Sequence, residues 1–254
     1  MTAHVTRPAS NETIRSITRH RSIRRYLAEP VAEAALDAIL ASAQASPTSS
    51  HKQAYSVIRV TDAAVRRELA VVADDQEWVQ QAPLFLVWCV DLHRIRVALT
   101  PIDAPMAYDN VEEFVVGVVD TTLAAAHAFV AAESLGLGGV LIGGLRNDPQ
   151  TVTQLLGLPE LVFPLFGMSL GYPAEDPGLK PRLPRSLVLH EERYRADGLA
   201  DELHDYDRIV ARYYLERAEN DRHTTWTSEM ARKFAEPQRP HLRAYLDGQG
   251  FRFD

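Results

Sequence analysis

The sequence lacks the signatures of several large classes of protein. Among its 254 residues there is one cysteine, Cys89, so the chain can form neither an intrachain disulfide nor a cluster of thiolate metal ligands. Cys89 lies in a continuous apolar run, which predicts a small buried side chain. The motifs C-x-x-C, H-E-x-x-H, G-x-S-x-G and Walker A do not occur. No metal site and no protein nucleophile is therefore predicted.

Positive charge is also scarce. Lysine and arginine total 27 against 34 aspartate and glutamate residues, which gives a formal net charge of -7. Proteins that bind nucleic acid in general need a basic surface to replace condensed counterions, so this balance argues against that class. It still permits a local basic pocket for a phosphorylated cofactor. Residues 1–19 lack the apolar core of a secretory signal, and together with the single cysteine they indicate a cytoplasmic protein.

An uninterrupted membrane-spanning run is missing as well. The longest apolar stretch, residues 111–135, is broken by Glu112, Glu113, Asp120, His127 and Glu133. Charges at that density are costly in lipid, so the stretch predicts a buried core helix and no membrane partner.

The remaining pattern mixes helices and strands without regular alternation. Helices are predicted at about 11–19, 32–45, 63–72, 110–135, 199–217, 227–235 and 239–248, with another beginning at Asp148-Pro149. Strands are predicted at 55–60, 84–90, 140–142 and 161–170. This order favours an α+β fold with four or five strands. We expect one domain over residues 1–254, with a flexible tail at 1–10 and a helical extension over about 190–254.

A glycine-rich stretch, residues 136–141, invites comparison with a dinucleotide-binding turn. It lacks the third glycine, and it precedes a strand where a Rossmann turn would follow one. A Rossmann site is therefore rejected.

Five other segments carry residues suited to a phosphorylated planar ligand. They are His20–Arg24, with three basic side chains and a hydroxyl; Pro47–Gln53, in which residues 48–53 carry hydroxyls and an amide; Ile142–Arg146, with paired glycines; Lys180–Arg182; and the pair Arg217 and Arg222. Arginine offers a planar fork of donors for phosphate, and glycine lets a backbone approach a ligand closely. Each segment alone is explained at least as well by an ordinary turn, linker or solvated helix end.

In combination these segments resemble one family. His-Arg-Ser-Ile-Arg near the start, Gln53, Gln76, Gly-Leu-Gly-Gly-Val-Leu-Ile-Gly-Gly-Leu-Arg-Asn, Pro-Leu-Phe-Gly and Leu-Lys-Pro-Arg-Leu-Pro follow one another in the same order. The chain resembles the oxygen-insensitive NADPH nitroreductases and the related NADPH:FMN oxidoreductases from about Ile17 to Phe251. The matches at Ser134–Asn147 and Lys180–Pro184 are specific, whereas the serine-rich loop alone is weak.

The resemblance implies an α+β sandwich around a mostly antiparallel sheet, built as an intertwined homodimer with FMN at the subunit interface. It implies the following cofactor-binding roles for residues of this sequence. His20, Arg21, Ser22, Lys180 and Arg182 would hold the phosphate and ribityl end; Arg24 would lie near N1 and O2 of the flavin; Thr48, Ser49, Ser50, Gln53 and Gln76 would bond the ring and ribityl edges; Ile142, Gly143, Gly144, Leu145 and Arg146 would line the pocket near N5 and O4; and Arg217 and Arg222 would contact the NADPH phosphate.

The resemblance further implies a ping-pong oxidoreductase that uses NADPH to reduce nitroaromatics or quinones by two electrons on FMN. Two alternatives stay open: a flavin reductase that supplies free reduced FMN to a monooxygenase, and a flavin- or nucleotide-binding protein without activity. His51, Lys52, Glu77 and Leu141 depart from residues common in the family. We expect these departures to affect the acceptor range and the preference for NADPH, but not the use of flavin.

Overall fold

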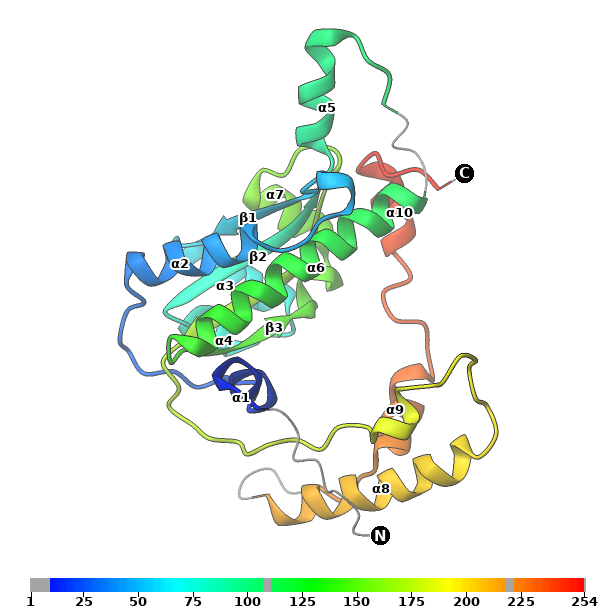
Figure 1. Ribbon diagram of the computed structural model, residues 1–254. Helices are drawn as coiled ribbons and strands as arrows, with labels where there is room; N and C mark the ends of the chain where they lie inside the picture. Colours follow the sequence, from blue (N-terminus) through cyan, green and yellow to red (C-terminus); the bar gives the residue numbers. More distant parts are fainter. Residues whose placement is uncertain (1–9, 107–110, 218–221, 254) are drawn as a thin grey trace. The chain divides into compact units, whose positions relative to one another are not determined.

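The computed structural model describes residues 10–106, 111–217 and 222–253. The predicted tail at 1–10 therefore lies almost entirely outside the described residues, as does the predicted helix start at Asn110. The chain divides into two compact units. The first comprises Met1–Glu175 and His241–Asp254, and the second comprises Asp176–Pro240. Figure 1 labels the helices and strands of both units.

The first unit is built on a four-stranded sheet. Its strands are β1 (Tyr55–Arg59), β2 (Leu84–Asp91), β3 (Gly138–Ile142) and β4 (Val162–Gly171). Their order is β1-β2-β4-β3, and all three pairings are antiparallel. Every residue of β2 and β4 is buried, because these central strands are covered on both faces. The predicted α+β class and the predicted four strands are confirmed.

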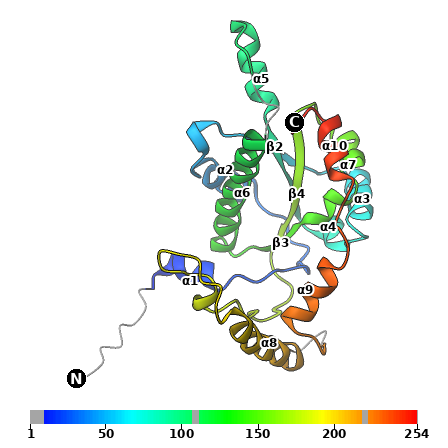
Figure 2. The ribbon, with the colours of Figure 1, turned by 90° about the vertical axis from the view of Figure 1, so that its right-hand side faces the viewer.

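Helices cover both faces of this sheet. The helices of the first unit are α1 (Glu12–Thr18), α2 (Glu33–Gln44), α3 (Ala63–Val72), α4 (Glu77–Gln81), α5 (His93–Leu99), α6 (Val111–Ser134), α7 (Pro149–Leu156) and α10 (Leu242–Gly248). Of these, α5 has no buried residue and projects away from the sheet (Figure 1). Alternate residues of β2 point to opposite faces: Leu86 and Trp88 pack with α2 and α6, whereas Val87 and Cys89 pack with α3, α4 and α7. Figure 2 shows these two helical layers with the sheet between them.

The central helix α6 is long and apolar enough, by length and composition, to cross a membrane. It packs against α2 and β2, and Ala124, Ala125 and Ala128 on that side are buried. The predicted core helix is therefore confirmed for the side that faces the sheet. Its other side differs from the expectation, because Val111, Val115 and Val119 are about half exposed.

Several short elements escaped the sequence-based prediction. Helices α4 and α5 were not expected, and neither were the 3-10 helices η1 (Ser49–His51), η2 (Thr100–Ile102), η3 (Gly143–Asn147) and η4 (Arg185–Leu187). Elements of three to seven residues carry too little apolar periodicity to be recognised. Cys89 behaves as predicted: it is fully buried, and burial raises the pKa of its thiol to about 12.

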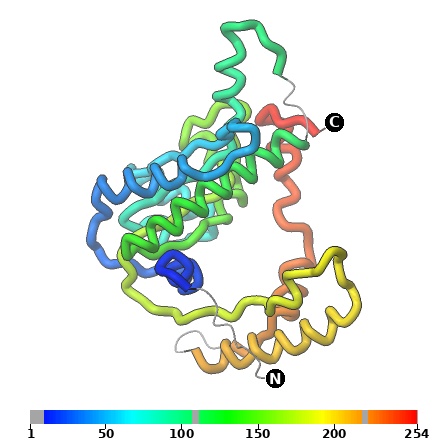
Figure 3. Tube along the Cα trace, viewed as in Figure 1, coloured from blue at the N-terminus to red at the C-terminus, as the bar shows by residue number. Residues whose placement is uncertain are grey.

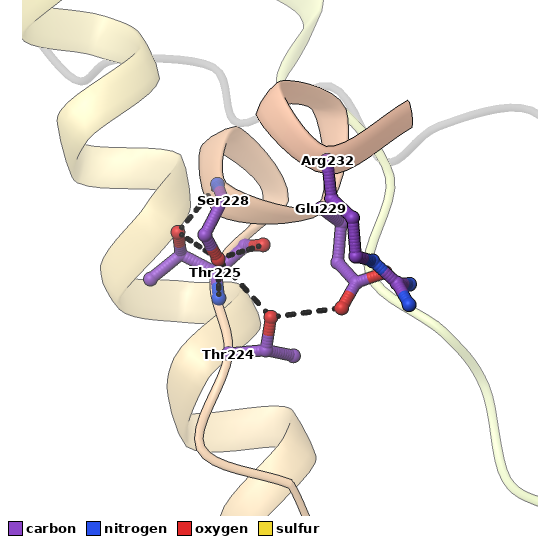
Figure 4. Close-up of polar contacts among 5 residues, drawn as sticks. All are labelled: Thr224, Thr225, Ser228, Glu229 and Arg232. Carbon is purple, nitrogen blue, oxygen red and sulfur yellow. Dashed lines mark hydrogen bonds and ion pairs between the residues drawn. The ribbon is translucent and has the colours of Figure 1, made fainter. Parts of the chain in front are cut away.

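The second unit contains α8 (Leu199–Glu216) and α9 (Trp226–Phe234), close to the two helices predicted there. Its small core comprises Tyr206, Val210 and Tyr214 of α8, with Trp226 packed against them. Helix α9 begins at a capping box, in which Thr225 accepts a hydrogen bond from the Ser228 amide and Ser228 accepts one from the Thr225 amide (Figure 4). The predicted helix at 239–248 is α10, and it belongs to the first unit.

Candidate functional site

The His20–Arg24 segment lies beside strand β3. The Ile23 amide donates to the Gly139 carbonyl at 2.9 Å, and Ser22 forms an isolated parallel bridge with Gly139. A Cβ atom at Gly138 would lie 2.6 Å from Cγ1 of Ile23. The absence of a side chain at Gly138 therefore allows the segment to pack against the edge of the sheet.

The beginning of the same segment is attached to the C-terminal end of α6. Nδ1 of His20 lies 2.7 Å from Oε1 of Glu133, and the His20 ring contacts the edge of Phe129. Arg21 and Glu133 line a depression of about 290 Å³ next to this contact. His20 is thus held by an acidic partner 113 residues away, which no local sequence pattern reveals.

Trp78 brings two predicted site residues together. The guanidinium carbon of Arg24 lies 5.4 Å from the centroid of the Trp78 ring, and the indole N–H donates to Oε1 of Gln76 at 3.1 Å. The Trp78 carbonyl accepts a hydrogen bond from the Ser169 hydroxyl on β4, which fixes α4 against the sheet. Trp78 was not predicted from the sequence, where its one signal is an aromatic residue two positions after Gln76.

The paired glycines lie at the other end of β3, in η3. Gly144 is buried, and a Cβ atom there would lie 2.9 Å from both Cα and Cβ of Ala73. Ile142 and Leu145 are buried in the core cluster on the α3 face. A small residue at Gly144 is therefore required by packing, whatever the backbone of this segment contacts. Gly143 is half-buried.

Arg146 closes this segment, and its guanidinium donates a hydrogen bond to the Leu165 carbonyl of β4. The Arg146 carbonyl in turn accepts from Nε2 of His241 at 3.0 Å, which ties the segment to the residue before α10. Arg146 is therefore fixed between β4 and the returning C-terminal chain.

The loop Thr48–Gln53 is held by α6. One carboxylate, that of Asp120, accepts hydrogen bonds from the amides of Ser49 and Ala54 at 2.9 and 3.1 Å. Nζ of Lys52 lies 2.8 and 2.7 Å from the two carboxylate oxygens of Glu113. Lys52, which departs from the family pattern, therefore forms an ion pair with Glu113 of α6. Ser49 and Ser50 are exposed, and Thr48 is half-buried.

A single copy of the chain keeps this loop apart from the His20–Arg24 segment. The loop is attached at Asp120, and His20 is attached at Glu133. These two anchors are thirteen positions apart on α6, which corresponds to about 20 Å along the helix. Figures 1 and 3 show α1 at the C-terminal end of α6, whereas the chain between α2 and β1 crosses its N-terminal half. The structure thus gathers the segments around β3 and Trp78 but leaves the loop at a second location.

The four remaining predicted cations belong to the second unit, where each of them lies near Tyr214 or Tyr206. Nζ of Lys180 lies 5.4 Å, and the guanidinium carbon of Arg217 4.9 Å, from the centroid of the Tyr214 ring. The Tyr214 carbonyl accepts from the Arg222 amide at 3.2 Å, and the Tyr206 hydroxyl donates to the Pro181 carbonyl at 3.0 Å.

The charge of Arg182 opposes the effect of burial, which raises the pKa of Tyr206. Arg182 is exposed and lies within electrostatic reach of that tyrosine. Neither Tyr206 nor Tyr214 was singled out from the sequence.

These donors fit a phosphorylated, planar, anionic cofactor such as FMN. Around β3 the first unit offers cations, a hydroxyl and an amide, and the second unit offers four further cations. Phosphate requires cations and hydrogen-bond donors, and a flavin edge requires donors and acceptors in one plane. Among the described residues, no group of three His, Cys, Asp or Glu side chains could hold a metal ion.

Two family models match the chain. The model of the nitroreductase family matches residues 17–172, and the model of its C-terminal domain matches residues 180–254. The gap between the two matches contains the boundary at Glu175 and Asp176 between the two units. The two divisions therefore agree at this boundary, whereas residues 241–254 belong to the first unit although the C-terminal family model matches them.

Relatives match over nearly the whole chain. An oxygen-insensitive NADPH nitroreductase of Salmonella typhimurium is 45% identical, covering 94% of this chain and 98% of the relative. An NADPH-flavin oxidoreductase of Vibrio harveyi is 42% identical, covering 94% of this chain and 98% of the relative.

Solved structures agree with these matches. The NADPH:FMN oxidoreductase of Vibrio harveyi in complex with NAD+ has a TM-score of 0.87 at 40% identity, covering 95% of this chain and 99% of that chain. Nitroreductase A of Vibrio parahaemolyticus has a TM-score of 0.89 at 42% identity, covering 96% and 99%. The sequence motifs, the fold and the site geometry thus converge, and the chain belongs to the nitroreductase family.

Proposed function

We propose that this protein is an FMN-dependent oxidoreductase that consumes NADPH and reduces a small planar acceptor by a ping-pong mechanism. The observation that carries the proposal is the contact of Trp78 with both Arg24 and Gln76, beside the β3 edge on which Ser22 lies. This contact unites residues separated by about fifty positions into one polar, cationic surface. Relatives named as NADPH nitroreductase and NADPH-flavin oxidoreductase support it.

The residues around β3 bind and tune the cofactor. His20, Arg21 and Ser22 hold the phosphate and ribityl end, and the family resemblance assigns Lys180 and Arg182 to binding of the same phosphate. Arg24 places a positive charge near N1 and O2 of the flavin, where reduction builds negative charge, and the Trp78 ring restricts its movement. The chemistry that FMN supplies when bound is the acceptance of a hydride and the passage of two electrons to the second substrate.

The remaining predicted residues complete the site. Gln76 bonds a flavin edge, with its carbonyl oxygen oriented by the indole of Trp78. The backbone of Gly143 and Gly144 would bind the edge of the flavin that carries N5 and O4, and Arg146 fixes this segment through its contact with β4. Arg217 and Arg222 bind the 2′-phosphate of NADPH. The Arg217 guanidinium lies over the Tyr214 ring, and this contact restricts where the cation can sit.

We infer that two copies of the chain assemble, because one copy separates parts of the site. The Thr48–Gln53 loop lies about 20 Å along α6 from the His20 anchor. A second copy can bring its own loop to the first copy's flavin. The half-exposed valines Val111, Val115 and Val119 follow one another at four-residue spacing along α6 and form an apolar stripe that a partner would cover. The single thiol is buried, and we place the dimer in the cytoplasm.

The first test is the colour of the purified protein. We expect a yellow protein that releases FMN on heating and whose flavin absorbance bleaches when NADPH is added without oxygen. A colourless protein with no affinity for added FMN would refute the proposal. Bound FMN that NADPH cannot bleach would indicate a binding protein without activity.

A second candidate function is a flavin reductase that releases reduced FMN, and relatives named as FMN reductases favour considering it. Steady-state NADPH oxidation with nitrofurazone, menadione and free FMN as acceptors separates the two. We expect kcat/KM to be higher for the nitroaromatic or the quinone. A large excess of kcat/KM for free FMN would favour the flavin reductase.

A further inference from the structure

The Thr48–Gln53 loop has an unusual backbone. Ser50, His51 and Gln53 have φ angles of 49°, 58° and 52°, although none of them is glycine. Residues with a Cβ atom lose free energy in the left-handed region, so three such residues within four positions persist only where neighbouring structure fixes them. The loop therefore needs anchors outside its own sequence.

Asp120 of α6 is the first anchor. It is fully buried, and its two carboxylate oxygens accept from the Ser49 amide and the Ala54 amide, one on each side of the strained residues. A buried carboxylate is costly unless its oxygens are hydrogen-bonded, and these two amides supply that compensation. Asp120 therefore fixes both ends of the loop at once.

Glu113 of α6 is the second anchor. It contacts Nζ of Lys52, which lies between His51 and Gln53. Glu113 and Asp120 are seven residues apart, about two helical turns, so both lie on the same side of α6. The side chains of Lys52 and Glu113 are 28% and 25% exposed, so this anchor is weaker than the buried one.

We propose that Asp120, supported by Glu113, is a positioning residue that holds the Thr48–Gln53 loop in the strained form that contacts the flavin. The inference rests on the proposed function, because it assigns the loop to FMN. Neither acidic residue touches the cofactor. Both act through the backbone and through Lys52, and the exposed hydroxyls of Ser49 and Ser50 are the groups they position.

The decisive variant is Asp120→Asn, which keeps one acceptor oxygen and turns the other into a donor that faces an amide N–H. Thr121→Val is the matched control: Thr121 is the fully buried neighbour on α6, and its hydroxyl donates to the Gly117 carbonyl at 2.7 Å, within the same helix. Glu113→Gln tests the second anchor on a more exposed surface and folds even if Asp120→Asn does not.

Three quantities are measured on the full-length protein: the Kd for FMN by fluorescence titration, the visible circular dichroism of bound flavin, and hydrogen exchange of the Ser49 and Ala54 amides without FMN. For Asp120→Asn we expect Kd to rise at least about tenfold, flavin dichroism to change and both amides to exchange faster. For Glu113→Gln we expect a smaller rise in Kd, about twofold to fivefold, in the same direction. Thr121→Val should lower the melting temperature without moving the three quantities.

The outcomes distinguish this inference from the proposed function. Unchanged amide exchange and unchanged Kd in both acidic variants would overturn the positioning role. The same would follow if Thr121→Val weakened FMN binding as much as Asp120→Asn, since the effect would then be general destabilisation. A wild-type protein with no affinity for FMN would refute the proposed function and this inference with it, whereas the exchange measurement would still report whether Asp120 holds the loop.

Discussion

The guanidinium carbon of Arg24 lies 5.4 Å from the centroid of the Trp78 ring, on a different element and 54 positions later in the chain. Trp78 also donates its indole N–H to Gln76. One aromatic side chain therefore orients a cation and an amide that the family resemblance assigns to the same flavin. Removing the Trp78 side chain should therefore disturb both Arg24 and Gln76, whereas a substitution of Arg24 or of Gln76 removes only one of the two contacts.

Replacing Trp78 should weaken FMN binding in two steps. Trp78→Phe keeps a ring beneath Arg24 but loses the N–H to Gln76, and we expect Kd for FMN to rise about threefold. Trp78→Leu also loses the ring, and we expect a rise of about tenfold. Phe253→Leu is the control, because it removes another arginine–aromatic contact, that of Arg243, away from these residues. Fluorescence titration measures each Kd, and equal affinity of Trp78→Leu and wild type would contradict the assignment.

Arg217 should discriminate between the two nicotinamide nucleotides. If it contacts the 2′-phosphate, Arg217→Ala should raise KM for NADPH about tenfold or more and leave KM for NADH nearly unchanged, because NADH lacks that phosphate. Arg212→Ala, at an exposed position of α8, is the matched control and should change neither value. Steady-state kinetics with both nucleotides provide the measurement. An equal rise in the KM for NADPH and in the KM for NADH would show that Arg217 does not bind the 2′-phosphate.

Gly144 should tolerate no side chain. Its Cβ would lie 2.9 Å from backbone and side-chain atoms of Ala73, and a backbone atom cannot move as a flexible side chain can. We expect Gly144→Ala to lower the free energy of unfolding by about 1–3 kcal/mol, as overpacking does. Gly248→Ala serves for comparison, since nothing lies within 4 Å of its Cβ position. Urea denaturation of both variants measures their free energies of unfolding. Equal values for Gly144→Ala and Gly248→Ala would show that the structure accommodates the added methyl group at Gly144 without cost.

Asp148 should make the stability of α7 depend on pH. Its carboxylate caps the helix, and the Thr151 hydroxyl, followed by the Thr151 amide, lowers the pKa of that carboxyl below its usual 3.8. A depressed carboxyl pKa adds stability above the unfolded pKa, and that stability is lost as the pH falls through the folded value. Asp148→Ala should therefore cost about 1 kcal/mol at pH near 7 and progressively less below a pH of about 4.

The control for this cap is Gln154→Ala, at an exposed position of the same helix. Urea denaturation at several pH values should show a constant difference between this control and wild type. A cost of Asp148→Ala that did not shrink in acid would show that the cap does not act through the ionised carboxylate.

Much of the local structure was determined by the sequence itself. Asp148-Pro149 predicted a capped helix start, and Asp148 does accept the Thr151 amide. The apolar runs around Phe85 and Phe163 predicted strands, and both strands are present and fully buried. Such predictions succeed because apolar periodicity and capping act within a few residues, so neighbouring side chains carry the whole signal.

Long-range contacts could not be obtained in that way. Nothing in the sequence around His20 indicates that Glu133 contacts it. Nothing in the sequence around Ser49 indicates that Asp120 accepts a hydrogen bond from its amide. Glu133 and Asp120 interrupt an apolar stretch of the sequence. From the sequence alone, they indicated only that this stretch does not span a membrane. Their roles depend on which part of the chain packs against which turn of α6.

The sequence by itself thus determined the α+β class, the four strands, the buried thiol and, through the ordered motifs from His20 to Pro184, the family. Only the tertiary structure decided that Trp78 orients Arg24 and Gln76, that Gly144 is small because Ala73 lies against it, and that Lys52 is paired with Glu113. The physical reason is that propensity and capping are local, whereas these contacts arise when packing of the core brings distant segments within a few ångströms.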